Sequence, residues 1–144
     1  RRSLDILIDR VIAFLNTLGL HALRGGGTAT LPRLRAPMGA VYPLKWTLRS
    51  VAAGDILARD GTELLGRLLE AELAVDIYSP YSGGGAACLT HAENIVTSFS
   101  APLPGFSVSE PTVGECKYNE RLDCFICQVT FQASAYRYTA GLAL

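Results

Sequence analysis

Apolar residues recur at two different spacings along the chain, and the change of spacing marks its elements. Over residues 69–78 apolar side chains fall on every second position, and Glu70, Glu72, Asp76 and Tyr78 occupy the other face. This alternation predicts a half-buried β-strand. Residues 79–85 then stop the strand, because Pro80 has no N–H to donate and three glycines tolerate positive φ. Over residues 88–99 the spacing becomes helical, which predicts a helix folded back across one face of the sheet.

An amphipathic helix is also predicted near the start of the chain, over residues 4–18, where the apolar positions follow a helix of about four turns. Ser3 is suited to cap this helix, and Asp5 stands in its first turn, where a negative charge complements the helix dipole. Gly19 is a natural stop at its end.

Residues 20–43 show no regular spacing of apolar residues and are predicted to form an extended loop or arm. Loops of this length are usually functional or disordered. A glycine-rich phosphate cradle is the alternative. The phosphate-binding pattern requires Gly-Lys-Ser/Thr at its end, however, whereas here the glycines lead to Thr28 and Ala29. Arg33 and Arg35 are expected to contact a neighbouring subunit or to face water.

Two long strands, over residues 41–53 and 63–78, are predicted to pair as an antiparallel ribbon spanning 41–78, long enough to project beyond the domain. The Asp60-Gly61 dipeptide between them is a strong hairpin signal. Trp46, in the first strand, is expected in the core rather than on a ligand surface, because buried aromatic residues dominate cores.

The C-terminal third predicts two short strands, over residues 106–110 and 113–118, and a long closing strand over residues 122–136. The more apolar face of this closing strand should pack into the core. It consists of Phe125, Cys127, Val129, Phe131 and Ala133.

The composition suits one folded domain spanning residues 1–144, with 49% hydrophobic and 18% charged residues, and excludes a disordered tail. So apolar a chain also favours burial against partners. The predicted fold is α/β, of the α+β type: a mixed or antiparallel sheet with an N-terminal and a central helix packed on it, plus the long ribbon and the extended loop.

The charges are unevenly spread although the formal net charge is zero. Residues 1–72 carry 10 basic and 7 acidic groups, and residues 73–144 carry 3 and 6. This imbalance is too small for a dedicated nucleic-acid binder. It suits head-to-tail contacts between copies, and an ordinary mixed surface explains it equally well. No apolar run reaches the roughly 18 residues that span a bilayer, so we expect a soluble protein made in a cytoplasm, with no membrane partner.

The four cysteines are expected to be free thiols. Cys124 and Cys127 have redox-motif spacing, but residues three apart in a strand point to opposite faces. With two histidines and no zinc-finger spacing, no metal site is expected.

A Cys-His nucleophile is the sharpest catalytic candidate. Cys88 and His91 share a helix face at i and i+3, and Asp76 or Glu93 is available to orient the imidazole. Cys88 fits the apolar stripe of the helix equally well, where it needs no chemistry. The glycines of residues 83–85 are read as a tight turn rather than an anion site.

Two paired carboxylates, Glu70 and Glu72, resemble a solvated strand face rather than an acid/base pair. No catalytic residue, cofactor or metal is therefore expected, and the protein is interpreted as a non-enzyme.

Residues 72–81, ELAVDIYSPY, are followed by a glycine turn, a cysteine-containing helix and a closing strand, residues 123–131, DCFICQVTF. In these segments and in the order of its elements, the chain resembles the tail-terminator or tail-completion proteins of long-tailed bacteriophages. The resemblance covers about residues 69–136, with the N-terminal helix also in place. The glycine/arginine-rich loop and the long ribbon do not match the family securely.

The resemblance implies a small α/β domain that assembles into a closed ring, typically a hexamer. Such a ring caps the phage tail tube, ends its polymerisation and offers the joining surface to head connector or neck proteins, with DNA only passing through the lumen. The location implied is the tail or neck of the virion, assembled in the host bacterial cytoplasm. The residues we assign to the subunit interface are Arg33, Arg35, Trp46, Arg49, Glu70, Glu72, Tyr78 and Tyr81.

Two other classes of function stay open. A small thiol-dependent enzyme would use Cys88 and His91 and requires a reactive cysteine of low pKa, whereas the structural interpretation requires an inert one. A monomeric binding module with the same fold would stay a single copy in solution.

Overall fold

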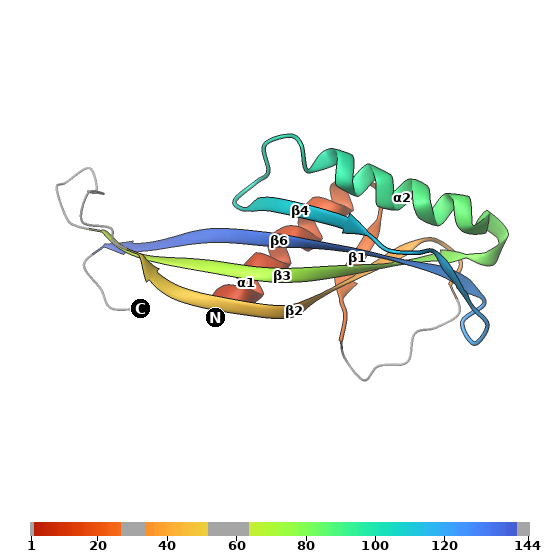
Figure 1. Ribbon diagram of the computed structural model, residues 1–144, viewed down its shortest axis with the longest axis horizontal. Helices are drawn as coiled ribbons and strands as arrows, with labels where there is room; N and C mark the ends of the chain where they lie inside the picture. Colours follow the sequence, from red (N-terminus) through yellow and green to blue (C-terminus); the bar gives the residue numbers. More distant parts are fainter. Residues whose placement is uncertain (1, 27–33, 52–63, 141–144) are drawn as a thin grey trace.

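Three long antiparallel strands form the centre of a six-stranded mixed sheet (Figure 1). They are β2 (Met38–Val51), β3 (Leu64–Pro80) and β6 (Cys124–Ala140), with β3 in the middle. The structure is a computed structural model that describes residues 2–26, 34–51 and 64–140. This mixed sheet with two helices confirms the α/β fold class predicted from the sequence.

Shorter strands complete the sheet on both sides. β1 (His21–Arg24) runs parallel to β2 on its outer side. β4 (Ser107–Val113) and β5 (Lys117–Asn119) both pair antiparallel with β6. β1 pairs only with the stretch from Met38 to Val41, so within the described residues the outer edge of β2 beyond Val41 carries no further strand.

Two helices cover the same face of this sheet. α1 (Ser3–Thr17) and α2 (Gly84–Ser98) contribute to one core together with alternate residues of β3 and β6. Aromatic rings join the layers: Phe99, just after α2, lies 6.3 Å from Phe14 of α1 and 4.8 Å from Phe131 of β6, centroid to centroid. We call this the covered face of the sheet and the other the open face.

The predicted strand, turn and helix at the centre of the chain are confirmed. β3 ends at Pro80, a single turn of 3₁₀-helix (Tyr81–Gly83) follows, and α2 begins at Gly84. Gly84 has φ of 71°, a conformation that side chains with a Cβ rarely adopt, which explains a glycine at this position. The expected core face of the closing strand is also confirmed, since Cys127, Val129 and Phe131 are almost fully buried.

The irregular segment predicted over residues 20–43 is shorter than expected, because both of its ends are strands. β1 has four residues, too few for a visible period. It is held by pairing with β2 and by Asn16, whose Oδ1 accepts a hydrogen bond of 3.1 Å from the backbone N–H of Ala22. Gly39 of β2 lies against Leu20, where a Cβ would come within 2.9 Å of the leucine side chain.

Trp46 lies outside the core, which corrects the expectation that it is buried. Its side chain is 46% exposed, although it is on the covered face opposite Ala71. The reason is its place on β2 beyond Val41, where this strand becomes the edge of the sheet. The predicted Asp60-Gly61 turn falls outside the described residues.

Candidate functional site

The residues assigned to a subunit interface are divided between two faces and two ends of the molecule. Arg49, Glu70 and Glu72 lie on the open face, as the strand register requires. Trp46 lies on the covered face, and Tyr81 follows the end of β3. Arg35 is exposed, and Arg33 lies outside the described residues. The seven of these residues that the structure describes therefore do not form one continuous surface.

Cross-strand ion pairs cover the open face along β2 and β3. Arg49 Nη2 lies 3.0 Å from Glu70 Oε1, and Lys45 Nζ lies 3.4 Å from Glu72 Oε2. Both cationic side chains are more than half exposed, so water and salt screen these pairs, and each is worth at most about 1 kcal/mol. They leave Glu70 and Glu72 neutralised as a solvated strand face, rather than arranged for acid/base chemistry.

Further along the open face, three side chains from three strands form a closed hydrogen-bonded triangle. Tyr42 Oη donates to Asp76 Oδ2 at 2.9 Å, and Gln128 Nε2 donates to Tyr42 Oη at 2.8 Å and to Asp76 Oδ1 at 3.0 Å. Partial burial, together with the hydrogen bond to Asp76 and its charge, raises the pKa of Tyr42 to about 12. Tyr78 shares this face, and burial followed by the charge of Asp76 raises its pKa as well.

A shallow polar groove of about 480 Å³ adjoins this triangle, on the side where β5 pairs with β6. Asp76 and Gln128 form one wall, and Lys117 and Asn119 of β5 also line it. Sequence reasoning did not find this groove, because the polar positions of β3 and β6 become neighbours only through the strand register.

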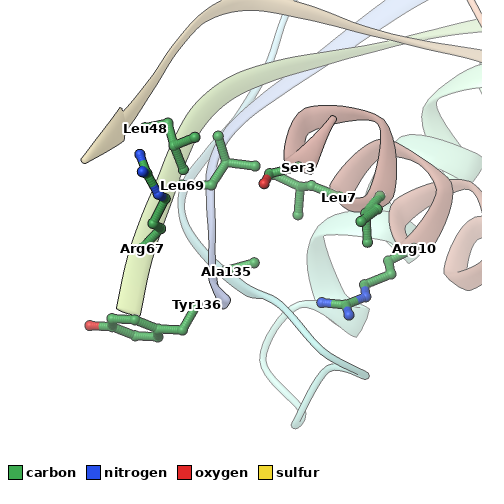
Figure 2. A pocket seen from close by; sticks show the side chains of 9 residues that line it. Ser3, Leu7, Arg10, Leu48, Arg67, Leu69, Ala135 and Tyr136 are labelled. Carbon is green, nitrogen blue, oxygen red and sulfur yellow. The ribbon is translucent and has the colours of Figure 1, made fainter. Parts of the chain in front are cut away.

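Apolar side chains are exposed on β2 near the start of α1. Leu44, Trp46 and Leu48 are 48%, 46% and 37% exposed. Beside Leu48 a small cavity opens between α1 and the sheet (Figure 2), and Leu7, Leu69 and Arg10 are among its lining residues.

Three aromatic rings cluster at the other end of β3. Tyr81 stacks on Phe125 with ring centroids 5.9 Å apart, and Tyr118 lies 5.5 Å from Tyr81 and 5.6 Å from Phe125. Tyr81 and Tyr118 are 59% and 47% exposed. We call Tyr81, Tyr118 and Phe125 the aromatic cluster.

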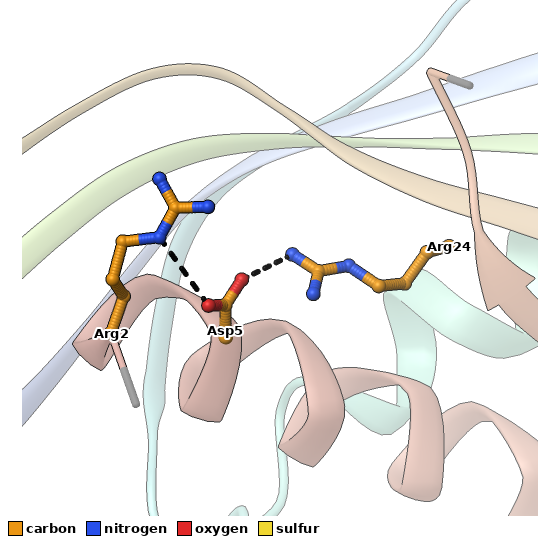
Figure 3. Close-up of polar contacts among 3 residues, drawn as sticks. All are labelled: Arg2, Asp5 and Arg24. Carbon is orange, nitrogen blue, oxygen red and sulfur yellow. Dashed lines mark hydrogen bonds and ion pairs between the residues drawn. The ribbon is translucent and has the colours of Figure 1, made fainter. Parts of the chain in front are cut away.

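A charged contact fixes the start of α1 to β1 (Figure 3). Asp5, in the first turn as predicted, lies 2.7 Å from Arg24 Nη2 and 3.5 Å from Arg2 Nε. Since β1 is short, this contact helps to hold the edge strand against the helix.

The candidate nucleophile Cys88 is completely buried. Its thiol donates to the carbonyl oxygen of Ile77 at 3.4 Å, and Cys116 and Cys127 are its neighbours. Burial, with the neighbouring thiols, raises the pKa of Cys88 to about 12. A nucleophilic cysteine needs the opposite shift and access to solvent, so this geometry favours an inert thiol.

Cys124 and Cys127 lie on opposite faces of β6, as the alternation of side chains predicts, and all four cysteines are free. Among the described residues, no group of three or more His, Cys, Asp or Glu side chains is arranged to hold a metal ion. Within the same part of the chain, neither helix is long and apolar enough to cross a membrane.

Comparisons with known proteins add no identification. No model of a known protein family matches the chain, and no curated protein matches it. The fold class and the surfaces described above are therefore the basis for a functional proposal.

Proposed function

We propose that this protein is a structural component of a phage tail, forming a ring that caps the tail tube, ends its polymerisation and provides the surface for head-tail joining. The order of elements supports this proposal. The two segments on which the family resemblance rests are neighbours: β3 and β6 pair along their whole length, with Val75 opposite Val129.

The observation that carries the proposal is the exposed apolar stretch of β2. Leu44, Trp46 and Leu48 stand at the edge of the sheet, and each is more than one third exposed. Contiguous exposed apolar surface marks interaction sites in soluble proteins, and tryptophan is enriched where protein partners meet. A subunit of a ring needs such a surface, whereas a solitary domain gains nothing from it.

The buried state of Cys88 favours this structural role over the thiol-dependent enzyme. A ring subunit needs only packing from this side chain, and Cys88 supplies packing within the core. The monomeric binding module remains the alternative that an experiment must separate from the ring.

The test is the mass of the protein in solution, measured by light scattering over a series of concentrations, with and without the tail-tube protein of the same phage. We expect a ring-sized oligomer, formed spontaneously or on the tube, and tubes that stop growing when it binds. Electron microscopy of tube lengths provides the second measurement. A protein that stays monomeric and leaves tube growth unchanged would support the binding module instead.

A further inference from the structure

A small cavity on the covered face has an apolar floor and cationic sides. Leu7 of α1 and Leu48 and Leu69 of the sheet line it, and Figure 2 shows Arg10 and Arg67 on opposite sides. Its volume is about 90 Å³, whereas small-molecule sites typically occupy about 300–1,000 Å³. The cavity therefore suits one protruding side chain of a protein partner better than a metabolite.

The apolar surface continues from this cavity onto β2. Leu48 pairs with Leu69 and Trp46 pairs with Ala71, so Trp46 and Leu48 stand next to each other on the covered face. Arg10 is held in place because its Nη1 donates a hydrogen bond of 2.8 Å to the carbonyl oxygen of Gly105. We use the name cationic cavity for this whole region, that is, the cavity together with Trp46 beside it.

The aromatic cluster has the complementary chemistry. Tyr118 Oη donates to Asp123 Oδ1 at 2.7 Å. This hydrogen bond, followed by partial burial and the charges of Asp123 and Glu120, raises the pKa of Tyr118 to about 12. Two carboxylates thus stand beside an exposed tyrosine pair. Two cations lie in the hairpin formed by β5 and β6. Lys117 lines the polar groove, and the charge of Arg121 partly offsets the raised pKa of Tyr78.

These two surfaces lie far apart on one molecule. Leu69 is in the cavity and Pro80 precedes Tyr81, and eleven residues of β3 at about 3.3 Å each separate them by roughly 36 Å. A molecule cannot place its own aromatic cluster on its own cavity, so any contact between the two surfaces joins different copies.

We propose that the aromatic cluster of one copy docks on the cationic cavity of the next, so that copies join head to tail. The inference rests on the proposed ring, since it assigns the two halves of the subunit interface. Arg10 and Arg67 meet the carboxylates of Asp123 and Glu120, and an exposed tyrosine enters the cavity. Tyrosine, tryptophan and arginine are the residues that dominate binding energy at interfaces. A contact between two different patches is heterologous, and it closes into a ring when the rotation between copies allows it.

Two double variants test this junction, because each removes one half of it. The cavity variant carries Trp46→Ser and Leu48→Ser, and the cluster variant carries Tyr81→Ser and Tyr118→Ser; all four side chains are more than one third exposed. Leu89→Ser is the matched control, because Leu89 is 45% exposed on α2, outside both surfaces. The measurement is light scattering of each variant alone and of the two mixed in equal amounts, with circular dichroism as the check of folding.

We expect each double variant alone to be monomeric at concentrations where the unaltered protein and the control assemble. The mixture should form a dimer and stop, because each variant retains the half that the other lacks. Dimer formation also demonstrates that both variants are folded. If one variant does not fold, Ala135→Leu, which fills the cavity from β6, or Glu120→Lys, which reverses a charge beside the cluster, takes its place.

A mixture that stays monomeric while the unaltered protein forms rings would overturn the docking and leave the proposed function standing. A mixture that dimerises, while the unaltered protein forms only open chains and does not bind tube protein, would support the docking and overturn the proposed function. An unaltered protein that is monomeric at every concentration, with and without the tube protein, would overturn both.

Discussion

The two faces of the central sheet use the same three strands for different purposes. On the covered face, Val75, Ile77 and Phe131 are almost completely buried beneath the helices. On the open face, at alternate positions of the same strands, Asp76 and Gln128 hydrogen-bond with Tyr42, and Arg49 pairs with Glu70. One residue along a strand separates a side chain that holds the fold from one that meets solvent.

This difference separates the side chains that stabilise the fold from those that contribute little to its stability. Burial of apolar surface is the dominant favourable term in folding, and here it is concentrated on the covered face. Exposed ion pairs contribute little, because water screens them and their long side chains lose entropy when they are fixed. The open face and the exposed part of β2 are therefore free to serve contacts with partners at little cost to the fold.

The largest expected effect is at the centre of the covered face. Phe131→Ala removes a ring that is 1% exposed and lies 4.8 Å from the ring of Phe99. Leaving a cavity there should lower the free energy of unfolding by about 3–5 kcal/mol. Urea unfolding, followed by circular dichroism, measures the change. The matched control is Gln132→Ala, one residue along β6 on the open face, for which we expect a loss of about 1 kcal/mol or less. Equal losses at both positions would remove the distinction between the faces.

A smaller effect is expected in the hydrogen-bonded triangle of the open face. Tyr42→Phe deletes the hydroxyl that donates to Asp76 and accepts from Gln128, at a cost of about 1 kcal/mol at neutral pH. The folded-state pKa of Tyr42 is raised from 10.0 to about 12. A raised pKa contributes stability that is complete below the unfolded-state value and is lost as the pH rises through the folded-state value. The contribution of Tyr42 should therefore be constant below pH 10.0 and decline toward about pH 12.

The measurement for this second prediction is urea unfolding at a series of alkaline pH values, together with a spectroscopic titration of tyrosinate. The decline in stability should be smaller in Tyr42→Phe than in the unaltered protein. Tyr81→Phe is the control, because Tyr81 is 59% exposed and stands outside the triangle, in the aromatic cluster. If the titration shows that the tyrosine lost in Tyr42→Phe has an ordinary pKa, the hydrogen-bonded triangle does not form as described.

The parts of this fold that follow from local patterns were predictable from the sequence. The helical spacing of α1 and the alternation of β3 and β6 each arise within one element, and the buried face of β6 follows from that alternation. The glycine at position 84 was likewise informative, because its positive φ is a conformation that glycine adopts readily.

The features that the sequence did not reveal depend on neighbours distant in the chain. Tyr42 is 86 residues from Gln128, and only the strand register brings them together. The cationic cavity likewise joins α1 to three strands, and Trp46 lies on the part of β2 that β1 does not reach. The two candidate surfaces, unlike the elements that carry them, are therefore products of the tertiary structure.

The smallest expected effect is at the exposed ion pair of Arg49 and Glu70. It tests whether the open face contributes as little to stability as the comparison of the two faces implies. In a double-mutant cycle of Arg49→Ala and Glu70→Ala, we expect a coupling energy of about 0.2–1 kcal/mol from urea unfolding, falling as salt is added. The pair is 62% and 48% exposed, so its charges lose little hydration when they meet. The same cycle in Lys45→Ala and Glu72→Ala is the matched control, because that pair bridges the same two strands. A coupling well above this range that resists salt would mean that the pair is desolvated, and that the open face, like the covered one, contributes to holding the fold.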